Sequence, residues 1–313
     1  MAGKEESMRV TVFGGAGFLG SHLADALSDA GFSVRIFDRA CSPHLRPDQE
    51  MVLGDILDKE AVSQALQGCH AAFNMAGIAD LDDCSTKPAL TVTQNVLGNV
   101  HILEGCLAQG IKRFVYASSI YVNSAKGGFY RCSKQAAESY VEEFRRQHGL
   151  EYTILRYGTL YGPRADRRNS VYRYLLQALT DKRIVIGASG EEMREYIHVC
   201  DAARLSVDIL APEYVDKRIN ITGHHPIRFR DLLETIREMF DNQVEITLAE
   251  SRNDTHYSRT PYSYQPKPSY KLTSTLTVDL GQGLLECLQE IAREMQPEEC
   301  PATGNTSRGP EQE

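Results

Sequence analysis

Three side chains near the middle of the sequence have the types and the spacing needed to move a proton. Tyr130 and Lys134 lie four residues apart, so a helix places them on one face, with about 6 Å of rise between them. A tyrosine with a pKa of about 10 is a poor base at neutral pH, and a nearby ammonium group favours its phenolate. Ser119, which follows an expected strand, can hydrogen-bond the same substrate oxygen. These residues predict a base that takes a proton from a sugar or alcohol hydroxyl while hydride leaves the same carbon.

A glycine-rich turn near the N-terminus predicts a binding site for the hydride acceptor. Without such a turn, the Tyr-x-x-x-Lys spacing could equally belong to an ordinary helix. The spacing is Gly14-x-x-Gly17-x-x-Gly20, after an apolar-rich run over 9–13 and before a helical pattern over 21–30. The first glycine allows a tight turn, the second lets a pyrophosphate approach the backbone, and the third lets helix and strand pack closely. The helix N-terminus then offers N–H groups to the phosphates. An ordinary glycine turn is the alternative, and the flanking strand and helix argue against it.

The end of the second expected strand indicates which dinucleotide would bind. The strand over 33–37 leads into Asp38, at the distance where an acid meets the hydroxyls of the adenosine ribose. A carboxylate there repels the 2′-phosphate of NADP, whereas Arg39 could stack on adenine or pair with such a phosphate. We therefore expect NAD as the cofactor, with Asp38 and Arg39 in its site.

Composition limits the classes of protein that the sequence can encode. The chain has 313 residues, 42% hydrophobic and 24% charged, with a net charge of −8, typical of a soluble globular protein with a sizeable core. No basic stripe for nucleic acid and no apolar run long enough for a membrane span is present, and the polar residues 1–7 predict no secretory signal. The eight cysteines form no CxxC pair, so we expect reduced thiols in a cytoplasmic protein, with no disulfide framework and no metal site.

Strand and helix patterns alternate over the first half of the chain. The expected strands cover 9–13, 33–37, 50–53, 71–75, 113–117 and 152–156, and the expected helices cover 21–30, 59–66, 89–109 and 130–148. This alternation predicts an α/β fold with a doubly wound parallel sheet of the Rossmann type, covered by helices on both faces. Right-handed crossovers place the carboxyl ends of the strands along one edge, where ligands bind.

The regular alternation loosens after about residue 162. Helices are expected over 170–180 and 201–210 and strands over 184–186 and 194–199, followed by a smaller mixed α/β lobe that includes a turn-rich loop over 261–268. We therefore expect a dinucleotide-binding domain over 1–162 and a substrate lobe over 163–295, with some chain returning to the sheet. The polar tail over 296–313 is expected to be disordered.

The motifs together resemble an extended short-chain dehydrogenase/reductase of the NAD-dependent epimerase/dehydratase family, over roughly residues 8 to 295. The resemblance implies that Phe18 and Leu19 donate backbone N–H groups to pyrophosphate and that Asp55 and Ile56 contact adenine. It also implies a catalytic set of Ser119, Tyr130 and Lys134. The cofactor-binding positions that it implies, together with Asp38, are Gly14, Gly17, Phe18, Leu19, Gly20, Asp55, Ile56, Met75, Ala76, Gly77, Asn95, Tyr130, Lys134, Tyr157 and Gly158.

Three residues are expected at the substrate. Besides Ser119, the resemblance places Thr159 where many relatives bind substrate through an asparagine. Arg194 leads a run that resembles the family segment whose arginine grips the substrate pyrophosphate, a role that suits bidentate guanidinium geometry. A surface ion pair with a glutamate such as Glu192 is the alternative for Arg194.

Departures from the family pattern narrow the reaction. Dehydratases of the family carry an Asp-Glu pair after the catalytic hydroxyl residue, and decarboxylases carry a glutamate directly after it, whereas this chain has Ile120 and Tyr121. Epimerisation or simple reduction remains. We expect a nucleotide-sugar epimerase, most similar to UDP-sugar 4-epimerases acting through a keto intermediate, in a homodimer built on the helices over 89–109 and 130–148. An NAD(P)H-dependent nucleotide-sugar ketoreductase and a non-catalytic dinucleotide-sensing scaffold are the alternatives.

Overall fold

A large parallel sheet forms the centre of the molecule in the computed structural model, which describes residues 7–248, 256, 258–261, 270–273 and 277–295. Within these residues the strand order is β3-β2-β1-β4-β5-β6-β10-β13, and every pairing is parallel. The strands are β1 (Arg9–Phe13), β2 (Ser33–Asp38), β3 (Gln49–Leu53), β4 (Ala71–Asn74), β5 (Arg113–Ser119), β6 (Glu151–Tyr157), β10 (Lys217–Ile221) and β13 (Tyr270–Leu272). The order reverses between β1 and β4, which is the doubly wound arrangement that the sequence predicts.

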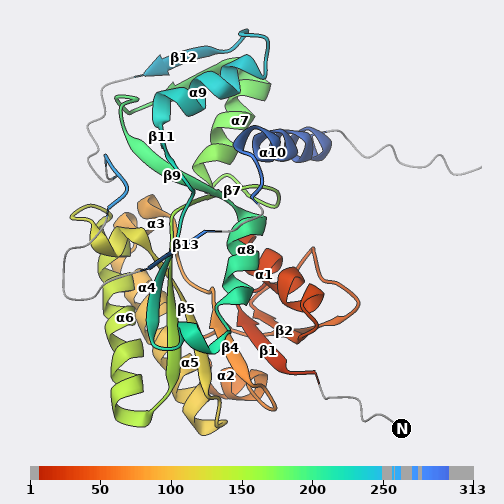
Figure 1. Cartoon of the computed structure of the whole chain (residues 1–313), viewed down its shortest axis with the longest axis vertical. Helices are drawn as coiled ribbons and strands as arrows, with labels where there is room; N and C mark the ends of the chain where they lie inside the picture. Colours follow the sequence, from red (N-terminus) through yellow and green to blue (C-terminus); the bar gives the residue numbers. More distant parts are fainter. Residues whose placement is uncertain (1–6, 249–255, 257, 262–269, 274–276, 296–313) are drawn as a thin grey trace, which may run out of the picture.

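Helices cover both faces of the large sheet because alternate strand residues point to opposite sides (Figure 1). In β5, Val115 joins one buried cluster, whereas Phe114 and Tyr116 join the other. The first cluster is closed by α1 (Phe18–Asp29) and α8 (Val199–Asp208). The second is closed by α2 (Lys59–Ala65), α5 (Gly98–Ala108) and α6 (Gly128–His148). This two-sided burial explains why the central strands are almost continuously apolar.

A smaller mixed α/β lobe lies beyond one end of the large sheet (Figure 1). Its elements are β7 (Thr159–Tyr161), α7 (Ser170–Asp181), β8 (Arg183–Ile186), β9 (Met193–His198), β11 (Pro226–Arg228), α9 (Phe229–Glu238), β12 (Glu245–Leu248) and α10 (Leu280–Glu294). Buried side chains of α7, α9 and α10, such as Leu175, Leu232 and Leu284, form a third core. The lobe therefore has its own apolar centre.

The chain crosses between the sheet and the lobe more than once. After β9 it returns through α8, the short turn η3 (Pro212–Tyr214) and β10 to the large sheet, and after the lobe elements β11, α9 and β12 it returns again through β13. Helix α10 then packs in the lobe core. The turn-rich segment over 262–269 and the tail over 296–313 lie outside the described residues.

The prediction of one continuous helix over 89–109 is wrong. The stretch over 89–109 consists of α4 (Pro88–Val92), a π-helical turn η1 (Thr93–Leu97) and α5, preceded by the short α3 (Leu81–Thr86). A π-helical turn admits one extra residue, so it rotates the side chains that follow it relative to those that precede it. The apolar spacing of the sequence is compatible with both forms, which is why it does not reveal the turn.

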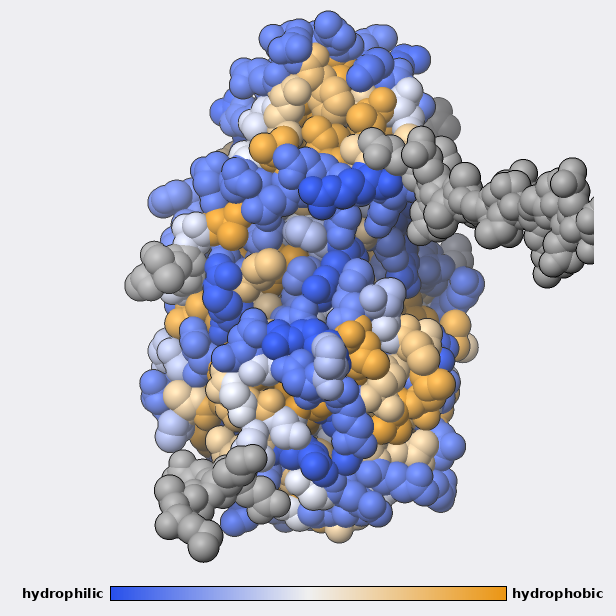
Figure 2. Space-filling model, turned by 90° about the vertical axis from the view of Figure 1, so that its right-hand side faces the viewer, coloured by the Kyte–Doolittle hydropathy of each residue, from blue (hydrophilic) through white to orange (hydrophobic). Residues whose placement is uncertain are grey.

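The surface between the sheet and the lobe is polar on the side that carries α1 and α8. Figure 2 shows hydrophilic residues forming a band across the middle of that face, with apolar residues gathered in patches above and below it. Among the residues that the structure describes, every helix is too short or too polar to cross a membrane.

Candidate active site

A cavity of about 880 Å³ lies at the carboxyl ends of the parallel strands, where the lobe meets the large sheet. Residues at or just after the ends of β1, β2, β4, β5 and β6 line it, among them Gly14, Asp38, Met75, Ser119 and Gly158. Tyr130 and Lys134 line the same cavity. The structure therefore brings the glycine turn and the expected proton-transfer residues to one site.

The glycine turn is close-packed against the neighbouring strand and its own helix. Gly14 has φ +77°, and a Cβ there would lie 2.6 Å from the backbone nitrogen of Ala76. A Cβ on Gly20 would lie 2.1 Å from the carbonyl oxygen of Gly14. Both positions therefore require glycine, one for its backbone conformation and its packing and the other for its packing alone.

The N-terminus of α1 is available to an anion. Its N-cap residue is Gly17, which has no side chain to bond the first N–H groups. Gly17, Phe18, Leu19 and Gly20 all line the cavity. Free N–H groups at the positive end of a helix dipole suit a phosphate or pyrophosphate.

Asp38 and Arg39 lie at the rim of the cavity, where β2 ends. The Asp38 carboxylate accepts hydrogen bonds from the backbone N–H groups of Ala16, at 3.1 Å, and Arg39, at 2.7 Å. These bonds hold the carboxylate beside the glycine turn. Arg39 is exposed, so its guanidinium can move toward a ligand at the same rim.

Five further expected cofactor residues line the cavity, namely Asp55, Ile56, Met75, Ala76 and Gly77. The Ile56 side chain is buried, and a Cβ on Gly98 of α5 would lie 2.4 Å from its Cδ1. Gly77 has φ +145°, and a Cβ there would lie 2.6 Å from the Asn95 side-chain oxygen. The loop after β4 can therefore pack against Asn95 only because it carries glycine at this position.

Asn95 is placed differently from the expectation that it contacts the cofactor. It lies in the π-helical turn behind the cavity and is absent from the cavity lining. Its side-chain oxygen accepts the Ile78 N–H at 2.7 Å, and its amide nitrogen donates to the Ile78 carbonyl oxygen and the Ser133 hydroxyl, both at 2.9 Å. In the structure, Asn95 therefore fixes the loop after β4 and joins it to α6.

Tyr130 and Lys134 share one face of α6, which points into the cavity. The Lys134 ammonium donates to the Ala117 carbonyl oxygen at 2.7 Å and lies 5.9 Å from the centre of the Tyr130 ring. Burial lowers the pKa of Lys134 to about 8, so the group is still largely protonated at neutral pH. Ser119 ends β5, is buried, and accepts the Tyr121 N–H at 3.3 Å.

A buried ion pair holds α6 against the sheet below these residues. The Glu138 carboxylate binds both Nε and Nη2 of Arg156 in β6, at 2.9 and 2.7 Å, and accepts the Ser118 hydroxyl at 2.6 Å. Both charged side chains are almost fully buried. Breaking the pair is costly, because removal of one partner would leave an uncompensated buried charge. The pair therefore holds α6 in place against β6, and with it Lys134, which lies one helical turn before Glu138.

The expected residues after β6 line the cavity with one difference. Gly158 and Thr159 face it, as does part of Tyr157. The Tyr157 hydroxyl, however, is bonded to the Ser206 hydroxyl of α8 at 2.6 Å. The Tyr157 hydroxyl therefore already has a partner in α8.

Arg194 enters the cavity from β9 in the lobe. Its side chain is mostly buried, and the guanidinium carbon lies 5.4 Å from the centre of the Phe229 ring. Glu192, the alternative partner, accepts backbone N–H groups of Ser189 and Gly190 at 3.1 and 2.9 Å. A guanidinium beside an aromatic ring gains a cation–π contact, and its planar shape suits bidentate binding of an anion.

Several cavity residues were not predicted from the sequence. They are Tyr121, His256, the cationic Lys87, Arg168 and Arg173, and the acidic Asp80, Asp82, Asp83 and Asp166. Among these residues, only Asp80 has a role that its neighbours in the sequence could have indicated. It caps α3 by accepting two backbone N–H groups at 2.9 Å. Three lobe tyrosines, Tyr172, Tyr262 and Tyr264, are possible stacking residues by their sequence, although surface or core positions are the favoured interpretation for each. The Tyr172 hydroxyl donates to Glu294 of α10, and Tyr262 and Tyr264 lie outside the described residues.

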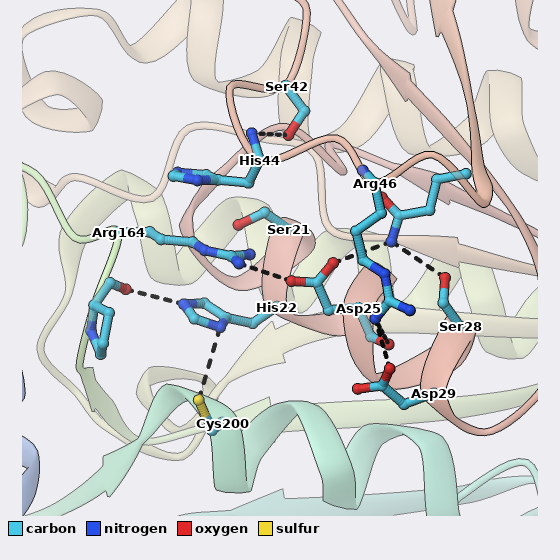
Figure 3. A network of polar contacts seen from close by, with 12 residues as sticks. Ser21, His22, Asp25, Ser28, Asp29, Ser42, His44, Arg46, Arg164 and Cys200 are labelled. Atoms are coloured by element: carbon cyan, nitrogen blue, oxygen red, sulfur yellow. Dashed lines mark hydrogen bonds and ion pairs between the residues drawn. The ribbon is translucent and has the colours of Figure 1, made fainter.

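A polar network joins α1 to the segment that leads into the lobe (Figure 3). His22 contacts the Pro163 carbonyl oxygen through Nε2 at 3.0 Å and the Cys200 sulfur of α8 through Nδ1 at 3.8 Å. Arg164, with φ +63°, pairs with Asp25 at 2.7 Å, and its backbone N–H donates to Glu290 of α10. Burial lowers the pKa of His22 to about 4, so its ring is neutral at neutral pH.

Curated relatives share most of the length of the chain. A putative UDP-glucose 4-epimerase of Methanocaldococcus jannaschii is 26% identical over 249 residues, covering 73% of this chain and 81% of the relative. The UDP-glucose 4-epimerase of Azospirillum brasilense is 27% identical over 288 residues, covering 79% of this chain and 81% of the relative. UDP-glucuronic acid decarboxylases of Arabidopsis thaliana also match, at 23–25% identity.

The fold and a family model agree with these relatives. The solved structure of the Thermotoga maritima UDP-glucose 4-epimerase with UDP-glucose superposes with a TM-score of 0.79 at 25% identity, covering 92% of this chain and 100% of that one. The Thermus thermophilus UDP-glucose 4-epimerase in complex with NAD has the same fold, with a TM-score of 0.77 at 23% identity. Residues 10–222 match the model of the NAD-dependent epimerase/dehydratase family. The chain belongs to this family, as its motifs indicate.

Proposed function

We propose that the protein is an NAD-dependent nucleotide-sugar epimerase that inverts C4 of a UDP-sugar through a transient keto intermediate. The observation that carries the proposal is the single cavity that joins the glycine turn after β1 to Ser119, Tyr130 and Lys134. The names of the relatives and of the solved structures with UDP-glucose or NAD support the reaction and the cofactor.

The residues around the glycine turn fit NAD. Gly14 and Gly77 line the cavity and carry no side chain, so their backbone faces the bound dinucleotide directly. The start of α1 offers N–H groups for a pyrophosphate. Asp38 supplies acceptors for two ribose hydroxyls and a charge that disfavours a 2′-phosphate. When bound, NAD supplies the acceptor and later the donor of the hydride.

The protein side chains then manage the proton and the substrate. The Tyr130 phenolate takes the proton of the sugar hydroxyl, and Ser119 hydrogen-bonds the same oxygen. The buried Lys134 ammonium, 5.9 Å from the Tyr130 ring, stabilises the phenolate through a poorly screened charge. After the keto sugar turns in the site and presents the opposite face of C4, Tyr130 returns the proton to the C4 oxygen.

Arg194 is the proposed anchor for the pyrophosphate of the substrate. The keto sugar must turn while it stays bound, so its hold depends on the nucleotide diphosphate rather than on the sugar ring. Arg194 lines the cavity beside Phe229, and a guanidinium is the side chain whose geometry matches a phosphate group in a bidentate manner. Thr159, on the same wall of the cavity, is proposed to contact the sugar.

The residues after Ser119 argue against the reactions of other family members. Decarboxylation and dehydration use a carboxyl group there, and this chain has Ile120, which is buried and apolar, and Tyr121. Neither side chain carries a carboxylate that could remove a carbon-bound proton at neutral pH.

The test is the cofactor content and the substrate turnover of the purified protein. An epimerase should carry bound NAD and interconvert UDP-glucose and UDP-galactose with no added dinucleotide. A ketoreductase, the first alternative, would consume NADH or NADPH in equal amount with the product. A dinucleotide-sensing scaffold, the second alternative, would bind NAD and turn over no nucleotide sugar.

We also propose a homodimer. Five large apolar side chains of α4, η1 and α6 are exposed, namely Leu90, Val92, Leu97, Phe129 and Tyr140. Exposed apolar groups on adjacent helices favour association with a second copy. Sedimentation should give a dimer for the natural chain and a monomer for a Leu97→Glu/Tyr140→Glu variant, and a monomeric natural chain would contradict the proposal.

A cytoplasmic location is proposed as well. The cysteines that the structure describes are all free thiols, which fits a reducing compartment. Fractionation of cells that make the tagged protein tests the location.

A further inference from the structure

Tyr121 is a second tyrosine held beside the catalytic one. It belongs to the short turn η2 (Ile120–Asn123) and lines the cavity. Its ring meets the Tyr130 ring edge-on, with ring centres 6.1 Å apart and planes at 78°. On another side, Gly127 has φ +97°, and a Cβ there would lie 2.6 Å from Cδ1 of Tyr121. The ring is therefore confined between Tyr130 and a backbone that only glycine allows to come so close.

The hydroxyl of Tyr121 reaches a distant part of the chain. It lies 2.7 Å from Nδ1 of His256, a residue 135 positions away, and both side chains line the cavity. Desolvation lowers the pKa of His256, and the positive charges of Arg194 and Arg173 act in the same direction. Phenol and imidazole therefore form an uncharged pair at neutral pH, with hydrogen-bonding groups of the kind that suit sugar hydroxyls.

We propose that Tyr121 and His256 form a wall of the sugar-binding end of the cavity, contact sugar hydroxyls, and restrict the site to hexoses without bulky substituents. The inference rests on the proposed function and adds the specificity of its sugar site. A sugar hydroxyl that reaches Tyr130 places the sugar ring beside Tyr121, because the two aromatic rings are neighbours. A side chain fixed on two sides cannot move away to admit a larger group such as an N-acetyl substituent.

The experiment compares UDP-glucose with UDP-N-acetylglucosamine on the NAD-loaded protein. Tyr121→Ala opens the wall and should raise the ratio of kcat/KM for the N-acetyl sugar over that for UDP-glucose by about tenfold or more. Tyr121→Phe keeps the ring and loses the hydroxyl, so the ratio should stay as in the natural protein while KM for both sugars rises. His256→Ala releases the ring from one side and should raise the ratio by a smaller factor.

Calorimetric binding of UDP alone separates the possible failures. If the natural protein binds no UDP and epimerises neither sugar, the proposed function fails. If UDP binds equally to the natural protein and Tyr121→Ala, bound NAD is unchanged, and the ratio moves by less than about twofold, the wall is absent. If Tyr121→Ala does not retain NAD, the ratio measured with His256→Ala decides by the same criterion.

Discussion

The two ends of the cavity are built in different ways. The part of the cofactor end proposed for the pyrophosphate is one short segment, Gly14 to Gly20, which offers backbone groups and is close-packed because it lacks side chains at its glycines. The proposed sugar end is made by side chains from distant positions that line the same cavity, including Ser119, Tyr121, Arg194 and His256. A binding site made of backbone groups can therefore be predicted from a local sequence motif. A binding site made of side chains depends on the tertiary structure and can change one residue at a time.

The largest expected effect separates chemistry from binding at the point where the two ends meet. Tyr130→Phe removes the base, so kcat for epimerisation should fall by about 10³-fold. Bound NAD should be retained, because the other expected cofactor-binding positions remain, and the affinity for UDP should stay unchanged. Tyr140→Phe, on the same helix but outside the cavity lining, loses the same hydroxyl and is the matched control, which should keep full activity. Full activity of Tyr130→Phe would remove the catalytic assignment.

The second prediction tests whether the cofactor end depends on close packing. Gly14→Ala should lose bound NAD and about 3 kcal/mol of unfolding free energy, because it adds both backbone strain and a contact with Ala76. Gly31 has a similar φ, +88°, with no atom within 4 Å of a Cβ. Gly31→Ala should therefore cost only about 1 kcal/mol and retain NAD. If denaturant titrations gave equal losses of unfolding free energy for the two variants, backbone strain alone would explain the need for glycine at position 14.

The third prediction concerns the network behind the cofactor end. Because the folded-state pKa of His22 is lowered from 6.5 to about 4, its stabilising contribution is complete above pH 6.5 and is lost as the pH falls through 4. Between pH 7 and pH 4 the natural protein should lose about 3 kcal/mol more unfolding free energy than His22→Gln. The same change at the exposed His224 should leave the pH dependence as it is. Parallel curves for the natural protein and His22→Gln would contradict the prediction.

The smallest effect is expected at the sugar end. Arg194→Lys keeps the charge but loses the paired N–H geometry, so the affinity for UDP should fall about tenfold, as measured by calorimetry. Bound NAD should stay unchanged. Arg228→Lys, on the exposed strand β11, is the control and should bind UDP normally. A loss of NAD together with UDP would show that the two ends are not independent.

The sequence predicted the parts of the site that depend on neighbours in the chain. Gly14, Asp38, Tyr130 and Lys134 follow from turn geometry, strand length and helix spacing, and the structure places all four at one cavity. The doubly wound sheet follows from alternating apolar strands and helices.

Other parts could not be predicted because they depend on contacts between distant residues. The bond between Tyr121 and His256 spans 135 positions, and neither residue lies in a motif. The π-helical turn that aims Asn95 at Ile78 has the same apolar spacing as a regular helix. The Tyr157 hydroxyl turns to Ser206 because α8, a later element, packs beside it.

The contacts of Pro163 and Arg164 have a consequence for how the molecule loses its structure. These two residues are held by His22 and Asp25 of α1, which Figure 3 shows beside Arg164, and also by Glu290 of α10. A lobe that melts while the sheet stays folded would have to break the ion pair with Asp25 and leave the His22 ring without its carbonyl partner. Heating should therefore give a single cooperative transition in which lobe and sheet unfold together.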